Sequence, residues 1–198
     1  ALCEAVIALA GDDSQNIDGL HIISKHVGVH ALAVLIDAQA QTATDLLPHF
    51  ASAGVTSVFD AGISVMPTEP GYEMYQRLER EGKLPVRVAG SYYWNQPAED
   101  DPAGKALKLR EKYHSELVQL TTLKINVDGG DLQRTSVMLK PYADDPNYRG
   151  EFLLGPKLIN PAVLKAQANG LDTHAHATGD GAIKAYLDAY GGVLEKMA

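Results

Sequence analysis

The amino-acid sequence predicts an α/β fold in which parallel strands alternate with helices. Short runs rich in β-branched and aromatic residues occur four times, and segments with apolar side chains at a spacing of three to four residues lie between them. Gly54 and Gly82 follow two of the helical segments, where helices commonly end. This alternation is typical of a parallel sheet. We expect a single domain over residues 1–198, with residues 1–41 as a preface and residues 42–198 as strand-helix units.

The first expected unit pairs a helix over residues 42–53 with a strand over residues 55–60. The helix has apolar residues at helical spacing, and the hydroxyl of Thr42 or Thr44 is a suitable N-cap. The strand sequence is VTSVFD, a β-branched and aromatic run of the kind found in buried strands. Residues 11–19, which are rich in Asp, Asn, Ser and Gly, are expected to form a loop earlier in the chain.

Further helices and strands are expected to alternate after this unit. Pro161 suits the first position of one helix, because proline lacks the N–H that the first turn leaves unpaired. Residues 129–155 form the longest irregular segment, directly after a strand. Because α/β folds place their sites at the carboxyl ends of strands, this loop is a candidate lid or substrate loop. The expected bounds are helix 70–81, strand 84–94, helix 105–120, strand 121–128, helix 160–168, strand 171–177 and helix 180–190.

The composition excludes several classes of protein. Acidic residues number 25 against 17 basic ones, so the formal charge is -8, and no Lys/Arg cluster indicates nucleic-acid binding. The single cysteine, Cys3, excludes an internal disulfide and a cysteine-based zinc cluster within one chain. No apolar run reaches the roughly 18 to 20 residues that span a bilayer. We expect a cytoplasmic protein without nucleic-acid or membrane partners. Because the chain begins at Ala1 without Met, we also expect it to be a piece of a longer protein.

Three histidines near the N-terminus are candidates for a metal site. His26 and His30 are four residues apart and would share a helical turn, with His21 nearby. No carboxylate partner accompanies them in a spacing that completes a ligand set. We therefore favour a partly exposed helix face for this segment.

Polar side chains occupy one face of the strand expected over residues 121–128. Because side chains alternate along a strand, Lys124, Asn126 and Asp128 share one face and the apolar residues between them share the other. A parallel strand that is buried on both sides is normally apolar throughout. The polar line therefore indicates either the interior of a barrel near its catalytic end or a half-exposed edge strand.

The next expected strand places His174 and His176 on one face. Two imidazoles in this arrangement can bind one metal ion, or they can belong to a polar network in the core. Asp180 follows at a position where it would cap the next helix. A lysine on one strand and imidazoles on the next admit two enzyme classes. Lys124 forms a Schiff base in an aldolase-like barrel, or it carries a carbamate that joins histidines in binding a divalent metal.

Three sequence blocks resemble the metal-dependent amidohydrolase superfamily. They are GVTSVFDAG at residues 54–62, LKINVDGGDLQRTSVML at residues 123–139 and THAHATGDGAIKAYLDA at residues 173–189. Within the superfamily they are most similar to the branch that includes N-substituted formamide deformylase. The resemblance extends over most of the chain from about Leu46 onward. It implies a partial TIM (β/α)8-type barrel, in which the four expected strands are the second to the fifth.

The resemblance also implies roles for individual residues. Lys124 matches the family lysine whose carbamate bridges two metals, and His176 matches the histidine ligand on the fifth strand. Asp128 and Arg134 match positions in the loop after the fourth strand, where substrate contacts are expected. The candidates for substrate contact or for support of the ligands are His174, Asp128, Arg134 and Asp180.

The activity that the resemblance implies is hydrolysis of an amide-like, non-peptide C–N bond in a small molecule. A divalent metal, with zinc expected, would polarise the carbonyl and activate water. The family's remaining ligands, on the first, sixth and eighth strands, lie outside this chain, so the 198 residues alone should be inactive. Two alternatives stay open. One is a Schiff-base lyase that uses Lys124, and the other is an inert half-barrel that forms homo-oligomers through exposed sheet edges.

Overall fold

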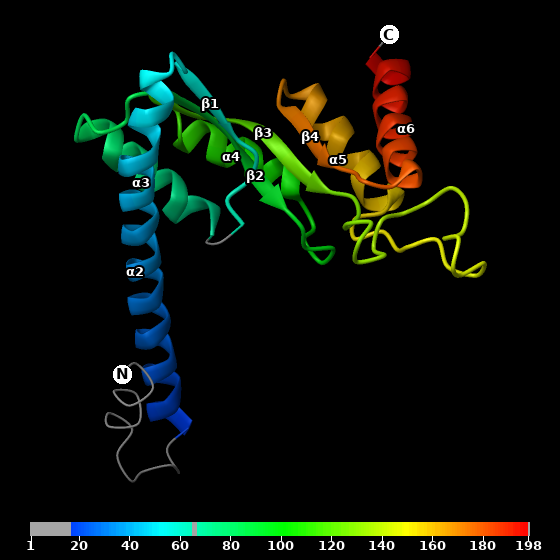
Figure 1. Ribbon diagram of the computed structural model, residues 1–198, viewed down its shortest axis with the longest axis horizontal. Coiled ribbons are helices and arrows are strands. Elements are labelled where there is room, and N and C mark those ends of the chain that lie inside the picture. The colour runs from blue at the N-terminus through cyan, green and yellow to red at the C-terminus, as the bar shows by residue number, and fades with distance from the viewer. Residues whose placement is uncertain (1–16, 65–66, 198) are drawn as a thin grey trace.

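The structure is a computed structural model that describes the backbone of residues 17–64 and 67–197 and the side chains of residues 33–64 and 67–195. Figure 1 shows a four-stranded sheet with helices packed beside it, and a long first helix that extends away from this body. The elements in chain order are α2 (Ile17–Ser52), β1 (Ser57–Asp60), α3 (Thr68–Arg80), β2 (Arg87–Trp94), α4 (Pro102–Lys112), β3 (Val118–Asn126), α5 (Pro156–Ala168), β4 (Asp172–His176) and α6 (Asp180–Met197).

The sheet follows the order of the chain and is parallel throughout. Its strands lie in the order β1-β2-β3-β4, and a helix connects each strand to the next. The predicted α/β fold is confirmed as a half-barrel of four strand-helix units, consistent with a partial TIM-type barrel. Parallel strands of this kind bring all their carboxyl ends to one edge, where the loops of α/β folds form binding sites.

The outer face of the sheet packs against the helices. Leu123, Ile125 and Val127 are fully buried, and they belong to one apolar cluster with Ile159 and Val163 of α5. Since side chains alternate along a strand, the residues between these apolar ones face the opposite, concave side of the half-barrel. Within the part of the chain that the structure describes, no helix combines the length and apolarity that a membrane span needs.

The helix predicted over residues 42–53 is the end of a much longer helix, so its predicted start is wrong. α2 begins at Ile17, and both threonines that were expected to cap it lie inside it. Thr42 Oγ1 donates to the carbonyl oxygen four residues earlier at 2.9 Å, and Thr44 Oγ1 does the same at 2.6 Å. These bonds satisfy the hydroxyls within a continuous helix, so a threonine by itself does not mark a helix start.

The loop predicted over residues 11–19 is wrong at its end, because residues 17–19 already belong to α2. Residues 11–16 lie outside the described part of the chain. The same holds for three side chains whose backbone belongs to α2, those of His21, His26 and His30. The metal site considered for these histidines therefore stays a sequence-based hypothesis.

The helix predicted over residues 105–120 is too long. α4 ends at Lys112, and Asp101 caps its start by accepting a hydrogen bond from Gly104 N to Oδ1 at 2.9 Å. Val118 and Leu120 belong to β3, where both are buried in the sheet. Their spacing of two residues fits a strand, and the short turn after α4 separates them from the helix. The apolar pattern alone did not reveal that turn.

α5 also begins earlier than predicted, and Pro161 lies inside it rather than at its first position. Pro156 occupies the start of the helix, where a missing N–H costs nothing. Because Pro161 has no N–H, α5 lacks one backbone hydrogen bond at this position. The strands predicted over residues 84–94 and 171–177 are confirmed, with ends up to three residues shorter.

A left-handed glycine ends each helix that leads directly into β1, β2 or β4. At the end of α3, Gly82 has φ of 65°. Its N–H donates to Glu79 O at 3.0 Å, and Lys83 N–H donates to Leu78 O at 2.8 Å, the paired bonds of a Schellman motif. This confirms the prediction that a glycine closes the helices before β1 and β2, at Gly54 and Gly82. The same motif ends α2 and α5 at Gly54 and Gly170.

We predict opposite effects for two glycine-to-alanine substitutions in equally open surroundings. A methyl group added at Gly82 or at Gly191 would meet no atom within 4 Å, but only Gly82 has positive φ. Gly82→Ala should lower the free energy of unfolding by about 1 kcal/mol, because the left-handed conformation disfavours a Cβ. Gly191→Ala, inside α6, should raise it by roughly 0.5–1 kcal/mol. Urea unfolding of both variants measures the difference, and equal effects would contradict the explanation.

Candidate active site

Polar side chains from three neighbouring strands form a row across the concave face of the sheet. In the strand register, Tyr93 of β2 pairs with Lys124 of β3, and Lys124 pairs with His174 of β4. Two residues further along β3 and β4, Asn126 pairs with His176. Paired residues on adjacent strands point to the same face. From the sequence, Lys124 was expected on one face of its strand, and His174 and His176 on one face of the next strand. The strand register shows that the two faces form one continuous side of the sheet.

Lys124 is a buried lysine, with 8% of its surface exposed. Burial lowers the pKa of its ammonium group below the ordinary value, because the charged form loses its hydration. A lowered pKa enlarges the neutral fraction at neutral pH, and the neutral amine is the nucleophilic form. A neutral Lys124 amine could form either a Schiff base or a carbamate, the two roles that the sequence left open.

His174 lies between Lys124 and an aromatic ring of β1. Its ring meets Phe59 edge to face, with 5.4 Å between the ring centroids. Burial, followed by the charges of Lys124 and His176, lowers the pKa of His174, so the neutral imidazole is favoured. Among the residues that the structure describes, its buried Nδ1 atom has no hydrogen-bond partner. An unpaired nitrogen on a neutral imidazole suits metal binding or contact with a substrate.

His176 ends β4 and is exposed at the carboxyl edge of the sheet. Its Nε2 atom lies 3.2 Å from Gly129 O and 3.3 Å from Thr178 Oγ1. Gly129 stands at the start of the long loop after β3, so the imidazole connects the end of β4 to that loop. The side chain is accessible to a bound ion or substrate from the concave side.

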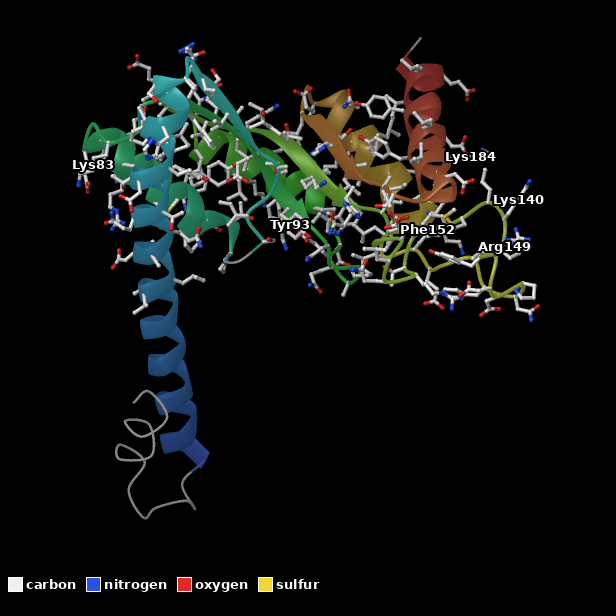
Figure 2. All side chains as sticks on the ribbon, viewed as in Figure 1. Lys83, Tyr93, Lys140, Arg149, Phe152 and Lys184 are labelled. Atoms are coloured by element: carbon white, nitrogen blue, oxygen red, sulfur yellow. The ribbon has the colours of Figure 1, made fainter. Side chains whose placement is uncertain are left out.

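Figure 2 shows the course of the long loop after β3. Lys140 and Arg149 mark its outer part, and Phe152 marks its return toward the sheet. This course brings the loop close to the start of α6, which Lys184 marks. Two carboxylates explain how the loop is held there.

The first of these carboxylates is Asp128, which is buried with 2% of its surface exposed. Its Oδ2 atom accepts hydrogen bonds from Val137 N at 2.8 Å and from Gly179 N at 2.9 Å. Its Oδ1 atom accepts a third from Thr178 N at 2.9 Å. These three backbone donors occupy the carboxylate, so the geometry fits support of the loop and of the turn after β4 better than direct contact with a substrate.

The second carboxylate is Asp180, the first residue of α6. Its Oδ1 atom accepts a hydrogen bond from Leu139 N at 2.7 Å, so it holds the loop. The N–H groups in the first turn of α6, which have no partner within the helix, also bind the loop: Gly181 N and Ala182 N donate to Val137 O at 2.9 and 3.2 Å. Loop and helix therefore satisfy one another's backbone groups.

The base of the loop over residues 129–155 packs closely against the turn after β4 and against the returning arm of the loop itself. A Cβ on Gly179 would collide with the carbonyl oxygen of Val137, and one on Gly150 would collide with that of Ser136. Only glycine permits such close approach of two backbones. The loop base is thus clamped from two sides, which suits a wall of preset shape beside His176.

Arg134 lies in the outer part of this loop and contacts other loop residues. Its Nη1 atom forms an ion pair with Asp144 at 3.3 Å, and its guanidinium stacks near the rings of Tyr142 and Tyr148 at 5.2 and 5.7 Å. Its φ of 56° is unusual for a residue with a side chain. These contacts place Arg134 in the framework of the loop, and the structure does not bring it to Lys124.

Sequence reasoning missed the part that Tyr93 and Asn126 play together. Asn126 Nδ2 donates to Tyr93 Oη at 2.6 Å, which connects β2 and β3 beside Lys124. Alternation along β2 was the available signal, because it separates Tyr93 from Trp94. Trp94 is fully buried in the core and donates from Nε1 to Gln96 O at 3.0 Å.

The donor atoms near Lys124 suit part of a metal site. Among the described residues, no group of three or more His, Cys, Asp or Glu side chains lies close enough to hold an ion. Lys124, His174 and His176 nevertheless share one face, and the buried Nδ1 of His174 lacks a partner within the described chain. These residues fit a metal as a partial ligand set that needs further donors.

Comparison with known sequences gives two matches. Residues 6–198 match the protein family described as "Amidohydrolase family". The Bacillus subtilis (strain 168) protein named "Putative amidohydrolase YtcJ" is 32% identical over 79 residues, which cover 40% of this chain and 15% of that protein. The chain therefore corresponds to a small part of this relative's length.

Two solved structures share the fold. An uncharacterised metal-dependent hydrolase from Pyrococcus furiosus has a TM-score of 0.62 and 25% identity, with 80% of this chain and 32% of that one covered. A second, from Pyrococcus horikoshii OT3, has a TM-score of 0.63 and 23% identity, with 88% of this chain and 34% of that one covered. The chain spans about a third of each.

We predict that Asp128→Asn destabilises the protein, although Asn is nearly the same size as Asp. The amide keeps one acceptor oxygen and turns an NH2 group toward backbone donors, so the free energy of unfolding should fall by about 3 kcal/mol. The matched control is Asp131→Asn in the same loop, where an exposed carboxylate accepts one local bond from Leu132 N. That change should cost under about 0.5 kcal/mol. Urea unfolding measures both, and equal losses would contradict the role of Asp128.

Proposed function

The chain belongs to the amidohydrolase family, and on that premise we propose that it forms part of a metal-dependent hydrolase of amide-like, non-peptide C–N bonds in small molecules. The family match and the metal-dependent hydrolases with the same fold support a hydrolase. The observation that carries the proposal is the buried Lys124, paired across the sheet with His174 and close to His176. On the basis of the three sequence blocks described above, we propose that the chain belongs to the formamide deformylase-like branch of the family.

We propose that Lys124 and His176 are the metal ligands contributed by this chain. Lys124 would act as a carbamate: its neutral nitrogen bonds to the carbon of CO2 and gives up a proton, leaving a carboxylate-like group. The lowered pKa of Lys124 favours this step, because only the neutral amine reacts. His176 has an exposed imidazole at the carboxyl edge, where a ligand can reach it.

The metal, for which we propose zinc, would polarise the scissile carbonyl and lower the pKa of a bound water. The residues of this chain would form the walls around the metal and the substrate. His174 presents a neutral imidazole toward the same space as Lys124. Asp128 and Asp180 fix the loop that forms one wall, and Tyr93 together with Asn126 forms another.

The remaining ligands would come from outside these 198 residues. A catalytic zinc typically has three protein ligands and an open position, and this chain offers two proposed ligands. The chain covers about a third of the solved hydrolases that share its fold. We therefore propose that the chain alone is inactive, and zinc-dependent hydrolysis of a simple amide by it would contradict this assignment. A cytoplasmic location is proposed as well, on an acidic composition with a single cysteine.

A second candidate function, an inert half-barrel that self-associates, is favoured by the open edges of the sheet. β1 and β4 are its edge strands, and each lacks a neighbour on one side within the described chain. Phe59 on β1 and Leu187 on α6 are exposed, at 47% and 62%. Edges and apolar surface of this kind favour association. A concentration-independent monomer mass in size-exclusion chromatography with light scattering would exclude this candidate.

We predict that Zn²⁺ binding depends on both proposed ligands. Lys124→Ala and His176→Ala should each weaken binding of Zn²⁺ to the chain at least about tenfold, because each removes one of few donors. His114→Ala is the matched control, since this exposed histidine lies in the turn before β3 and should leave binding unchanged. Equilibrium dialysis measures all three, and unchanged binding in the two ligand variants would contradict the proposal.

We predict that the chemistry of Lys124 separates the hydrolase from the Schiff-base alternative. With ¹³C-bicarbonate and Zn²⁺, a carbamate carbon signal should appear in NMR spectra and disappear in Lys124→Ala. With borohydride and an aldehyde or ketone, a carbamate enzyme should gain no stable adduct at Lys124. Reductive trapping at this residue would instead support a Schiff-base lyase.

A further inference from the structure

One buried atom beside Lys124 lacks a hydrogen-bond partner, the Nδ1 atom of His174. It is shielded from solvent, and among the described residues no group lies within hydrogen-bond distance of it. A buried polar atom without a partner destabilises a protein, and native structures contain few of them. A group that is added to the site after folding would supply the missing partner.

The strand register limits which groups can reach this atom. β4 is an edge strand of the described sheet, and its one neighbour is β3, where Lys124 pairs with His174. An atom that faced the open side of β4 would be exposed, so the buried Nδ1 faces inward, toward Lys124. Burial lowers the pKa of His174 most, and the charge of Lys124 is the next cause. This second cause agrees with a short distance between the two side chains.

The ring of Phe59 holds the imidazole of His174 from the far edge of the sheet. Phe59 lies on β1, the opposite edge strand, and meets His174 with 5.4 Å between the ring centroids and 71° between the ring planes. Its register partner on β2 is Ala89, whose small side chain leaves the ring room to reach across the curved sheet. An edge-to-face contact favours one mutual orientation of two rings. Phe59 therefore limits rotation of the imidazole.

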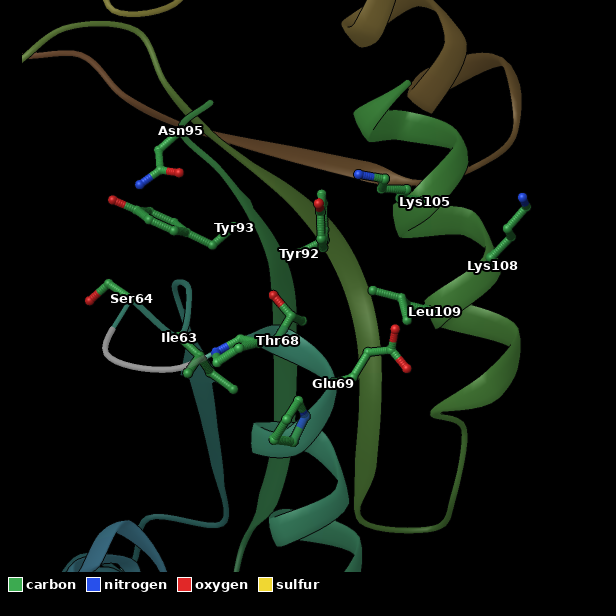
Figure 3. A pocket seen from close by; sticks show the side chains of 12 residues that line it. Ile63, Ser64, Thr68, Glu69, Tyr92, Tyr93, Asn95, Lys105, Lys108 and Leu109 are labelled. Atoms are coloured by element: carbon green, nitrogen blue, oxygen red, sulfur yellow. The ribbon is translucent and has the colours of Figure 1, made fainter. Parts of the chain in front are cut away.

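Lys124 is closed in on its other side by Tyr93. Figure 3 shows the ring of Tyr93 directed away from α4, and Asn126 Nδ2 donates to its hydroxyl oxygen at 2.6 Å. Burial alone lowers the pKa of Lys124, and within the described chain no charge or hydrogen bond contributes to the shift. Lys124 and His174 thus face each other as two buried groups without partners. An acceptor between them would satisfy both.

We propose that His174 is a positioning residue for a carbamate on Lys124, to which its Nδ1–H group donates a hydrogen bond. This inference rests on the proposed function, which supplies the carbamate. The neutral nitrogen of Lys124 bonds to the carbon of CO2, one C=O electron pair moves onto oxygen, and the nitrogen's proton goes to water. The product has two acceptor oxygens, so His174 can hold one edge while a metal binds the other. Carboxylates that bind metals are commonly held by such a neighbouring donor.

The test compares two substitutions of His174 in the presence of ¹³C-bicarbonate and Zn²⁺. His174→Leu removes the donor, so the equilibrium constant for carbamate formation, measured from the carbamate carbon signal, should fall at least about tenfold. His174→Asn keeps an N–H group near the position of Nδ1 and should stay within about threefold of the native chain. His114→Leu is the matched control, because it removes an exposed histidine outside the site and should change nothing.

Two further measurements separate positioning from a merely structural role. His174→Leu should weaken Zn²⁺ binding roughly tenfold in the native chain. It should have no such effect when Lys124→Ala is already present, because His174 acts through Lys124. NMR spectra that correlate the imidazole protons with ¹⁵N should place the proton of His174 on Nδ1 once the carbamate has formed.

The part of Phe59 is tested with Phe59→Leu, which keeps an apolar side chain but removes the ring. Carbamate formation should fall roughly threefold, in line with the loss of one aromatic contact. Phe152→Leu is the control, because it changes an exposed phenylalanine of the long loop that does not contact His174. Equal carbamate formation in these two variants would overturn the role of Phe59.

The outcomes distinguish this inference from the proposed function. If the native chain and His174→Leu form the carbamate equally well, the positioning role is wrong and the carbamate on Lys124 stands. Equal losses in His174→Asn and His174→Leu would also overturn it, since they indicate that the imidazole binds the metal directly. If the native chain shows no carbamate signal with Zn²⁺, the carbamate on Lys124 is wrong and this inference is overturned with it.

Discussion

The site depends on the buried carboxylate of Asp128. Three backbone N–H groups converge on it, from Val137 in the long loop and from Thr178 and Gly179 after β4. Hydrogen bonds to a charged acceptor contribute about 1.5–3 kcal/mol each, and leaving such buried donors unpaired costs a similar amount. One side chain thereby fixes the end of β3, the base of the loop and the turn that follows His176. The position of the imidazole is consequently tied to the position of the loop.

The second constraint is a lysine on a sheet whose other face is closed by helices. Burial of Lys124 costs free energy unless the group is neutral or meets a partner. The described residues supply neither an ion pair nor a hydrogen bond to it. A purely structural role would be served better by an aliphatic side chain in this row. The buried Nδ1 atom of His174 beside it, which has no partner among the described residues, strengthens the same argument, because a buried polar atom without a partner calls for a functional explanation.

Much of the fold could be predicted from sequence because local patterns encode it. Runs of β-branched and aromatic residues located the four strands, and Gly54 and Gly82 marked helix ends through a backbone conformation that few other residues adopt. Helix starts were harder, since Thr42 and Pro161 satisfy the requirements of a first turn yet are tolerated inside helices. The start of β3 was misplaced because apolar residues near Val118 fit a helix or a strand equally well.

The candidate site was predictable only in part, because several of its contacts join residues that are far apart in the sequence. Lys124 and His176 were visible because each interrupts an apolar strand. The role of Asp128 in holding the loop could not be predicted, because its partners lie 9, 50 and 51 residues away along the chain. They are also backbone N–H groups, which carry no sequence signature. Tyr92 and Tyr93 show the same limit. As neighbours on β2 they point to opposite faces, one toward Glu99 and α4 and the other toward Asn126. The register of β2 against β3 decides that Tyr93 is the ring that joins the row beside Lys124, and no local pattern in the sequence shows that register.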